Sequence, residues 1–274
     1  ELAENIENQQ WIVLDCRHDL ANLDAGRTAY AAGHIPGAQF AHLDSDLSEK
    51  SPGPNGEFRG RHPLPERSKF IQTLRRWGIN DDTQVIAYDA QGGMYAARLW
   101  WMLRWVGHQS VAVLDGGIGA WNALNLPMST ESVAKASGSI HDLPALVATV
   151  RAEDLVANIA NPQRTVVDAR AADRYRGENE TMDPVGGHIP GAKNRFFKDN
   201  LQADGTFKPA EQLRAEFGAL IDNAANSVMQ CGSGVTACHN LLALEVAGMS
   251  GAALYPGSWS EWCSNPARPV VTGN

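Results

Sequence analysis

The pattern of apolar and polar positions along the chain predicts short β-strands that alternate with amphipathic helices. Apolar runs rich in β-branched residues are expected to form strands at 11–17, 85–88, 111–115, 165–170 and 227–230. Helical periodicity is expected over 68–77, where Gly78 ends the pattern, over 94–106, and over 241–246. Strands that alternate with helices are typical of a parallel sheet with helices on both faces, so we predict an α/β fold.

An internal repeat indicates that this fold occurs twice. Residues 33–38 (GHIPGA) recur without change at 187–192. In each half an apolar run that ends in an acidic and a basic residue precedes this turn. In each half a second apolar run, a glycine turn and a tryptophan follow it. We therefore predict a duplicated domain, with a first copy at 1–128, a linker at 129–146 and a second copy at 147–274.

The candidate nucleophile is Cys231, which opens the loop 231–236 (CGSGVT) between a predicted strand and a predicted helix. Gly232 and Gly234 let the backbone turn so that several N–H groups can face one point. The N-terminus of the following helix adds partial positive charge, and both effects favour a thiolate over a thiol. The alternative for Cys231 is a buried core cysteine, which is the role expected for Cys238 inside the helix.

The two halves differ at this position. When they are superposed by sequence, Asp89 stands where the second half has Cys231, and residues 90–93 (AQGG) do not reproduce the cysteine loop. We therefore expect one active centre, in the second half. His34 and His188 occur in both copies of the GHIPGA turn, so they are expected to fix the turn rather than to take part in chemistry.

Composition excludes several classes of function. The formal net charge of -8 argues against general nucleic-acid binding. The four cysteines show neither metal-ligand spacing nor a disulfide framework, so we expect no metal, no cofactor and a reducing, cytoplasmic compartment. No stretch is apolar enough for a membrane span, and none has the pattern of a signal peptide.

Together these features resemble the tandem rhodanese-type sulfurtransferases, and the resemblance covers essentially the whole chain. It implies two tandem rhodanese-like domains, of which only the second is catalytic. In that family, thiosulfate-using members typically carry the loop CRKGVT and mercaptopyruvate-using members typically carry CGSGVT. The loop at 231–236 has the second form. The resemblance thus implies 3-mercaptopyruvate as the sulfur donor. Thiosulfate is the alternative, because 178–185 lacks the second arginine that mercaptopyruvate-specific relatives often carry there.

The resemblance also implies a role for each residue of the loop. Cys231 would attack the sulfur of the donor and become a persulfide, and cyanide, a thiol or thioredoxin would remove the outer sulfur. Backbone amides of the loop, at Gly232, Gly234 and Val235, would stabilise the anion. The hydroxyls of Ser233 and Thr236 would hydrogen-bond the sulfur or the substrate carbonyl, with local helix capping as their alternative.

Outside the loop, the resemblance points to three further side chains. Arg174 matches a family arginine that holds the substrate carboxylate, and Arg170 is the alternative, although it is expected to tie loops together. His62, within 60–65 (GRHPLP), matches a family histidine that faces the cleft. It would act with the loop serine and with an acid, for which Asp44 is the candidate.

Three other classes of function are weighed against this hypothesis. A cysteine phosphatase needs Cys-x5-Arg, but position 237 is alanine. A dithiol oxidoreductase needs Cys-x-x-Cys, and Cys231 and Cys238 are too far apart for that motif. A catalytically weak interaction module of the same fold is the remaining alternative, and the presence of Cys231 and its glycines argues against it.

Overall fold

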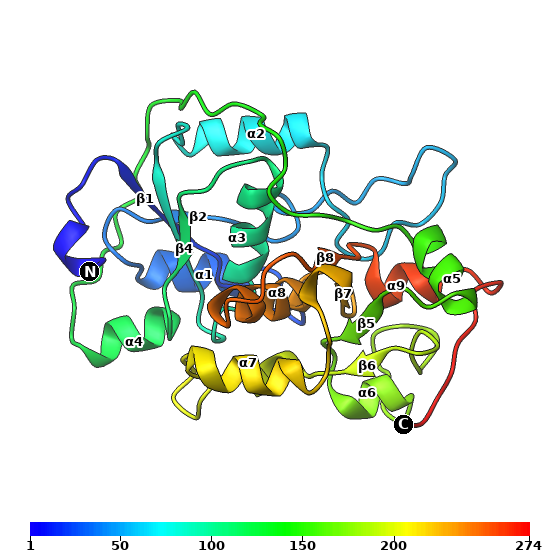
Figure 1. Ribbon diagram of the computed structural model, residues 1–274. Coiled ribbons are helices and arrows are strands. Elements are labelled where there is room, and N and C mark those ends of the chain that lie inside the picture. The colour runs from blue at the N-terminus through cyan, green and yellow to red at the C-terminus, as the bar shows by residue number, and fades with distance from the viewer. The chain divides into compact units, whose positions relative to one another are not determined.

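The computed structural model describes residues 1–274, which form two compact units. The first unit contains residues 1–49, 65–146 and 203–206, and the second contains residues 50–64, 147–202 and 207–274. Each unit has its own four-stranded parallel sheet (Figure 1). The duplicated α/β fold with a parallel sheet in each copy, predicted from the alternation and the repeat, is confirmed.

A short segment from each half of the sequence belongs to the unit that the other half builds. Residues 50–64 lie between β2 (Gln39–Phe40) and α2 (Arg67–Arg76), but they belong to the second unit. Residues 203–206 lie at the matching point between β6 (Lys193–Asn194) and α7 (Ala210–Gly218), but they belong to the first unit. We call residues 50–64 the arm. The boundaries expected at 128 and 146 do not include this exchange and stay a prediction.

In the first unit the strand order is β2-β1-β3-β4, with β1 at Trp11–Asp15, β3 at Gln84–Tyr88 and β4 at Val111–Val113. Right-handed crossovers place α2 and α3 (Ala96–Trp105) on one face of this sheet. They place α1 (Ala25–Ala32) and α4 (Gly117–Ala123) on the other, as Figure 1 shows. The short 3₁₀ helix η1 (Ala3–Asn5) precedes β1.

The second unit repeats this topology in the order β6-β5-β7-β8, with β5 at Thr165–Asp168, β7 at Ser227–Gln230 and β8 at Ala253–Leu254. The helices α7 and α8 (Thr236–Val246) pack against each other. The helices α5 (Ala152–Ala160), α6 (Ala172–Arg176) and α9 (Ser258–Trp262) complete the unit (Figure 1). Two 3₁₀ helices, η2 (Phe197–Asn200) and η3 (Ala224–Asn226), lie in the connections.

The central strands are buried on both faces, which explains their continuous apolar sequences. All four residues of β7 are buried, as are the last four of β1 and of β3. In the second unit, Val166 and Val228 pack with Trp259 and Trp262 of α9 in one apolar cluster. The strands β3 and β7 end immediately before Asp89 and Cys231, so each unit presents its loop at the carboxyl edge of its sheet, where ligands bind in such folds.

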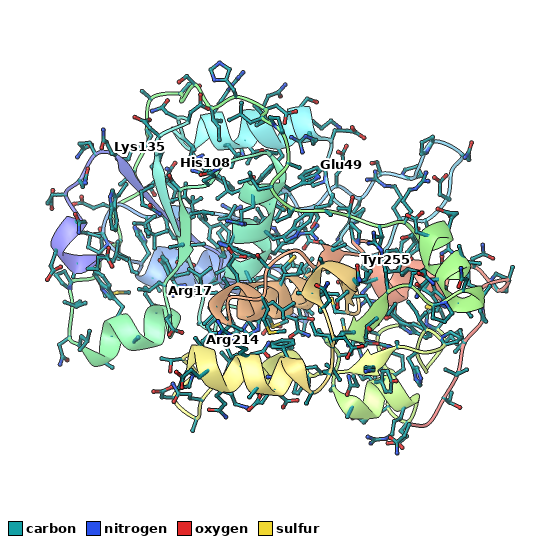
Figure 2. The ribbon with its side chains drawn as sticks, in the orientation of Figure 1. Arg17, Glu49, His108, Lys135, Arg214 and Tyr255 are labelled. Atoms are coloured by element: carbon teal, nitrogen blue, oxygen red, sulfur yellow. The ribbon has the colours of Figure 1, made fainter.

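The same ion pair closes the first strand of each unit. Arg17, labelled in Figure 2, donates to both oxygens of Asp15 and to the carbonyl of Gly33 at 2.7 Å. In the second unit, Arg170 donates to Asp168 and to the carbonyl of Gly187 at 2.6 Å. Because the pair recurs in the unit without a nucleophile, it serves the fold of both units.

The histidines of the GHIPGA turns also make matching contacts. His34 stacks on Tyr30 at 3.9 Å and His188 stacks on Tyr175 at 3.7 Å, each with its Nδ1 at the backbone carbonyl of the same tyrosine. These contacts hold the turn against the preceding helix, as expected from their presence in both halves. No helix in the structure combines the length and the apolar character that crossing a lipid bilayer requires.

Candidate active site

Cys231 lies directly after β7 and is 1% exposed. The N–H of Gly234 donates to its Sγ at 3.2 Å, so the loop turns an amide toward the sulfur as the glycine spacing predicts. Gly234 has a φ of +76°, and a Cβ there would lie 2.2 Å from the carbonyl oxygen of Pro256. Only glycine fits this position. The first N–H groups of α8, which begins at Thr236, have no partner within the helix and add to the positive potential.

Ser233 is joined to His62 by a hydrogen bond of 2.7 Å between Oγ and Nδ1, and both side chains are buried. His62 reaches the loop because the arm belongs to this unit. The bond links residues 171 positions apart in the chain. Capping of α8 is not the role of either loop hydroxyl in this structure, because the N-cap residue is Val235 and no side chain caps the helix.

Two arginines lie above the backbone of Gly232. A Cβ at this glycine would be 2.8 Å from Nη2 of Arg61 and 3.7 Å from Nη2 of Arg174. The missing side chain of Gly232 therefore makes room for two guanidinium groups beside Cys231. Arg174 was expected here, and Arg61 was not.

Two acids hold these guanidinium groups in place. Arg61 pairs through Nη1 with Asp183, and Nη2 of Arg174 lies 2.8 Å from Glu180 and 3.5 Å from Asp183. Burial alone would raise the pKa of Glu180. Hydrogen bonds from Arg174 and from the backbone of Met182 and Asp183 outweigh it and lower this pKa. Glu180 is therefore ionised at neutral pH and fixes the fork of Arg174.

Arg170, the alternative for the substrate carboxylate, is 3% exposed. In addition to Asp168 and Gly187 it contacts Glu180 at 3.2 Å and lies over the ring of Trp259 at 4.5 Å. The pKa of Arg170 is raised, because the neighbouring carboxylates outweigh its burial. These contacts suit a residue that ties loops together, while its part in substrate binding stays a prediction.

Sequence reasoning missed Arg61, although it singled out its neighbour His62. The segment 178–185 has no basic residue, and the structure places Asp183 of that segment against Arg61. The only signal in the sequence was that Arg61 is next to His62. Two neighbouring side chains can reach the same site when the backbone turns between them.

The equivalent loop of the first unit is built around a carboxylate. Oδ1 of Asp89 accepts from the amides of Gln91 at 2.8 Å and Gly93 at 2.9 Å. Its Oδ2 accepts from Tyr95 at 2.7 Å and Ala96 at 2.9 Å. The first unit thus carries no nucleophile at this position, in agreement with the asymmetry that the sequence shows.

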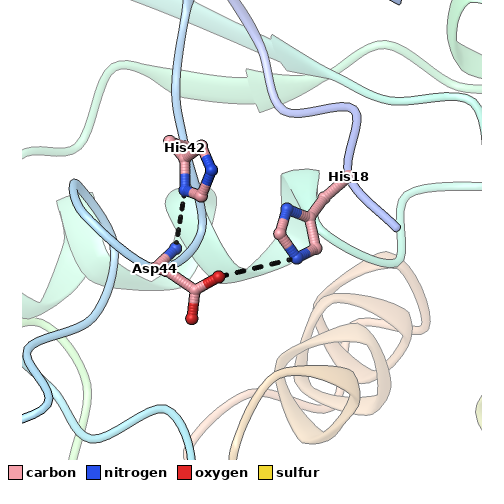
Figure 3. A group of neighbouring side chains, drawn as sticks. All are labelled: His18, His42 and Asp44. Carbon is pink, nitrogen blue, oxygen red and sulfur yellow. Dashed lines mark hydrogen bonds and ion pairs between the residues drawn. The ribbon is translucent and has the colours of Figure 1, made fainter. Parts of the chain in front are cut away.

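One group of side chains has the composition of a metal site, and it lies in the first unit. Figure 3 shows His18, His42 and Asp44, whose potential ligand atoms lie within 4.8 Å of one another. However, Nδ1 of His42 accepts a hydrogen bond of 3.1 Å from the backbone N–H of Asp44. The proton of a neutral His42 ring then sits on Nε2, so neither nitrogen offers a lone pair to a metal. The arrangement does not favour a metal ion.

Comparisons with known proteins agree with the geometry of this site. The Rhodanese-like domain model matches residues 1–124 and 151–265. A probable 3-mercaptopyruvate sulfurtransferase of Pseudomonas aeruginosa is 44% identical over 100% of this chain and 96% of the relative. A putative thiosulfate sulfurtransferase of Mycobacterium tuberculosis is 40% identical over 95% of this chain and 90% of the relative.

Solved structures show the same fold. The structure of 3-mercaptopyruvate sulfurtransferase from Leishmania major superposes with a TM-score of 0.85 at 30% identity, covering 98% of this chain and 75% of that one. The resemblance inferred from the repeat and the cysteine loop is confirmed. The chain belongs to the rhodanese family, and it carries two rhodanese-like domains in tandem.

Proposed function

We propose that this chain is a sulfurtransferase that moves sulfane sulfur from 3-mercaptopyruvate to a thiophilic acceptor through a persulfide on Cys231. The observation that carries the donor assignment is the pair of guanidinium groups, from Arg61 and Arg174, above Gly232. A thiolate beside two forked cations suits a small donor that has both a carboxylate and a transferable sulfur. The sulfurtransferase names of the relatives support the same activity.

In the proposed reaction, the Cys231 thiolate attacks the sulfur of 3-mercaptopyruvate. The S–S bond forms as the C–S bond breaks, and the electron pair of that bond stays with the carbon. Pyruvate leaves as its enolate and takes up a proton. In the second step an acceptor attacks the outer sulfur and Cys231 returns to the thiolate. Cyanide would become thiocyanate, and a small thiol or thioredoxin would become a persulfide.

The other site residues act on these steps by position and charge. The amides of Gly232, Gly234 and Val235 and the N-terminus of α8 stabilise negative charge on the sulfur. The bonded pair of Ser233 and His62 places a hydroxyl and an imidazole ring beside the nucleophile, where they can hydrogen-bond the substrate carbonyl and deliver a proton to the leaving enolate. Thr236, at the first position of α8, is proposed as a second hydroxyl toward the sulfur.

The carboxylate of the donor is proposed to bind Arg174 and Arg61 together. Each guanidinium already holds an acidic side chain, so both forks are pre-oriented before the substrate arrives. The Nε of Arg61 is buried without a hydrogen-bond partner. This donor is unsatisfied in the free protein, and a substrate oxygen would satisfy it once the guanidinium turns toward the substrate. Arg61 thus supplies the second cation that 178–185 lacks.

Thiosulfate is the second candidate donor, because a relative that is 40% identical carries that name. The same two arginines could hold a sulfonate. The loop itself offers a dianion no charged side chain, since Gly232 and Ser233 stand where thiosulfate-using members carry arginine and lysine. All four cysteines are free thiols, which supports the reducing, cytoplasmic setting in which a persulfide carrier would work.

Steady-state transfer of sulfur to cyanide, with each donor in turn, tests this proposal. We expect the higher kcat/KM with 3-mercaptopyruvate. Arg61→Gln and Arg174→Gln should each raise the KM for that donor by roughly 10- to 100-fold, the size of a lost charge-assisted hydrogen bond. Arg59→Gln is the matched control, because it removes the same charge from the arm and Arg59 donates to the carbonyl of Leu64 rather than to Asp183 or the loop 231–236. A higher kcat/KM with thiosulfate would overturn the donor assignment.

A further inference from the structure

Ser258 is hydrogen-bonded to the backbone of Cys231, the proposed nucleophile. It has a φ of +51°, and it is one of two residues other than glycine with a positive φ in the chain. Its Oγ accepts a hydrogen bond of 3.0 Å from the backbone N–H of Cys231. The same hydroxyl donates to the carbonyl of Tyr255, labelled in Figure 2, at 2.9 Å. The side chain is fully buried, so both bonds form out of contact with water.

The first turn of α9 adds two further bonds to the same stretch of loop. The N–H of Trp259 donates to the carbonyl of Cys231 at 2.9 Å, and the N–H of Ser260 donates to the carbonyl of Gly232 at 2.9 Å. Together with the bond to Ser258, these contacts fix the peptide on each side of Cys231. The direction of the Cα–Cβ bond, and with it the position of Sγ, follows from the backbone that they hold.

The first unit shows the same turn without the hydroxyl. Gly117 takes the place of Ser258, with a φ of +56°, and the N–H of Ile118 donates to the carbonyl of Asp89 at 2.9 Å. A Cβ at Gly117 would lie 2.1 Å from that carbonyl oxygen. The unit without a nucleophile thus uses glycine, for which this conformation carries no strain. The catalytic unit uses a serine in the same conformation, which is unfavourable for a residue with a side chain.

We propose that Ser258 is a positioning residue for the Cys231 nucleophile, and that the strained backbone is kept because only a side chain there can reach the N–H of Cys231. Without this bond the peptide between Gln230 and Cys231 can rotate. Sγ would then leave the 3.2 Å contact with the amide of Gly234. Strained residues cluster at functional sites because the strain fixes a working geometry. This proposal rests on the proposed function of Cys231 as the nucleophile.

Two substitutions separate positioning from strain. Ser258→Ala removes the hydroxyl and keeps the strain, whereas Ser258→Gly removes both. We expect each variant to lower kcat for sulfur transfer by about tenfold, with KM changed less than about twofold, because the Ser258 hydroxyl is fully buried and bonded to two backbone groups. The glycine variant should melt roughly 2–4 °C above the alanine variant. Ser264→Ala is the control, since Ser264 also donates to a carbonyl of α9, that of Glu261, but is exposed and has no bond to the loop.

The rate at which iodoacetamide alkylates Cys231 between pH 5 and pH 9 gives a second readout that needs no sulfur donor. Both variants should alkylate Cys231 at a rate about threefold or more different from the wild type, and Ser264→Ala should match the wild type. A Ser258→Gly variant with wild-type kcat and wild-type alkylation would overturn the proposal, whatever happens to the alanine variant. If the wild type transfers no sulfur, the proposed function fails, and the alkylation rates still decide whether Ser258 positions Cys231.

Discussion

The loops after β3 and β7 begin at matching places in the two units and hold different side chains. In the first unit the carboxylate of Asp89 accepts four backbone hydrogen bonds, two on each oxygen. In the second unit the sulfur of Cys231 accepts one, from Gly234. The carboxylate reaches the amides of its loop itself. The side chain of Cys231 is shorter than that of Asp89, so the amides of its loop are left to bind a group that extends beyond the sulfur.

This difference shows how two copies of one fold can present different side chains after matching strands. The strand order, the arginine–aspartate pair and the stacked histidine are the same in both units. The two units differ in the residue that directly follows β3 or β7. They also differ in the residue that holds this position by a hydrogen bond. Asp89 fills its own loop with four hydrogen bonds, and under the proposed function Cys231 leaves its loop available for the sulfur that it carries.

The largest expected effect distinguishes Cys231 from the other thiols. Burial, with a further contribution from Asp183, raises the pKa of Cys263 to about 11. Burial and the charges of Asp89 and Asp15 raise the pKa of Cys16 as well. Below its pKa a thiol is protonated and unreactive, so at pH 7 only about one Cys263 in ten thousand is a thiolate. Its labelling should rise about tenfold per pH unit up to about pH 11.

Timed iodoacetamide labelling followed by peptide mapping measures the reaction rate of each cysteine. At pH 7 we expect Cys231 to react at least about a hundredfold faster than Cys16 and Cys263. Equal labelling rates for the three thiols would show that Cys231 is no more reactive than a core cysteine, and this would contradict its role as the nucleophile.

The next effect concerns the carboxylate of the first unit. Asp89→Asn replaces one acceptor oxygen by an NH₂ group that must face backbone N–H donors, and it removes the charge that strengthens the other bonds. We expect the free energy of unfolding of the first unit to fall by about 2–4 kcal/mol, measured by urea denaturation. Asp82→Asn, on the exposed surface of the same unit, should change it by less than about 0.5 kcal/mol. Equal changes in the two variants would show that the bonds to Asp89 do not stabilise the loop.

The smallest effect tests how the arm is held in the second unit. Oγ of Ser260 accepts from the backbone N–H of Arg61 at 3.1 Å. Ser260→Ala should let Arg61 shift, and we expect the KM for 3-mercaptopyruvate to rise about two- to fivefold with kcat unchanged. Ser264→Ala is again the control. A change in kcat alone would show that Ser260 acts on the nucleophile rather than on Arg61.

Much of the fold could be predicted because its signals are local. The run 227–230 coincides with β7, and the helical pattern over 68–77 lies within one residue of α2 at each end. The two-residue strands β2 and β6 escaped prediction, since two residues show no periodicity. Six helices were not identified either: α1, α4, α5, α6, α7 and α9.

The candidate site was predictable where one stretch of sequence builds it. The loop 231–236 forms from consecutive residues, and its glycines show the turn directly. Arg61 was missed because its place depends on the arm joining the second unit, and neither periodicity nor composition carries that information. Ser258 was missed for a related reason, since its hydroxyl matters only through a bond to a residue 27 positions away.

The most direct test of the account is the mass of the protein after incubation with 3-mercaptopyruvate and removal of the excess. We predict a gain of one sulfur atom on the peptide that contains Cys231, lost again when cyanide is added with the appearance of thiocyanate. Cys231→Ser should gain none, and Cys263→Ser should gain the same amount as the wild type. Added sulfur on another cysteine, or a Cys231→Ser variant that still transfers sulfur to cyanide, would contradict the account.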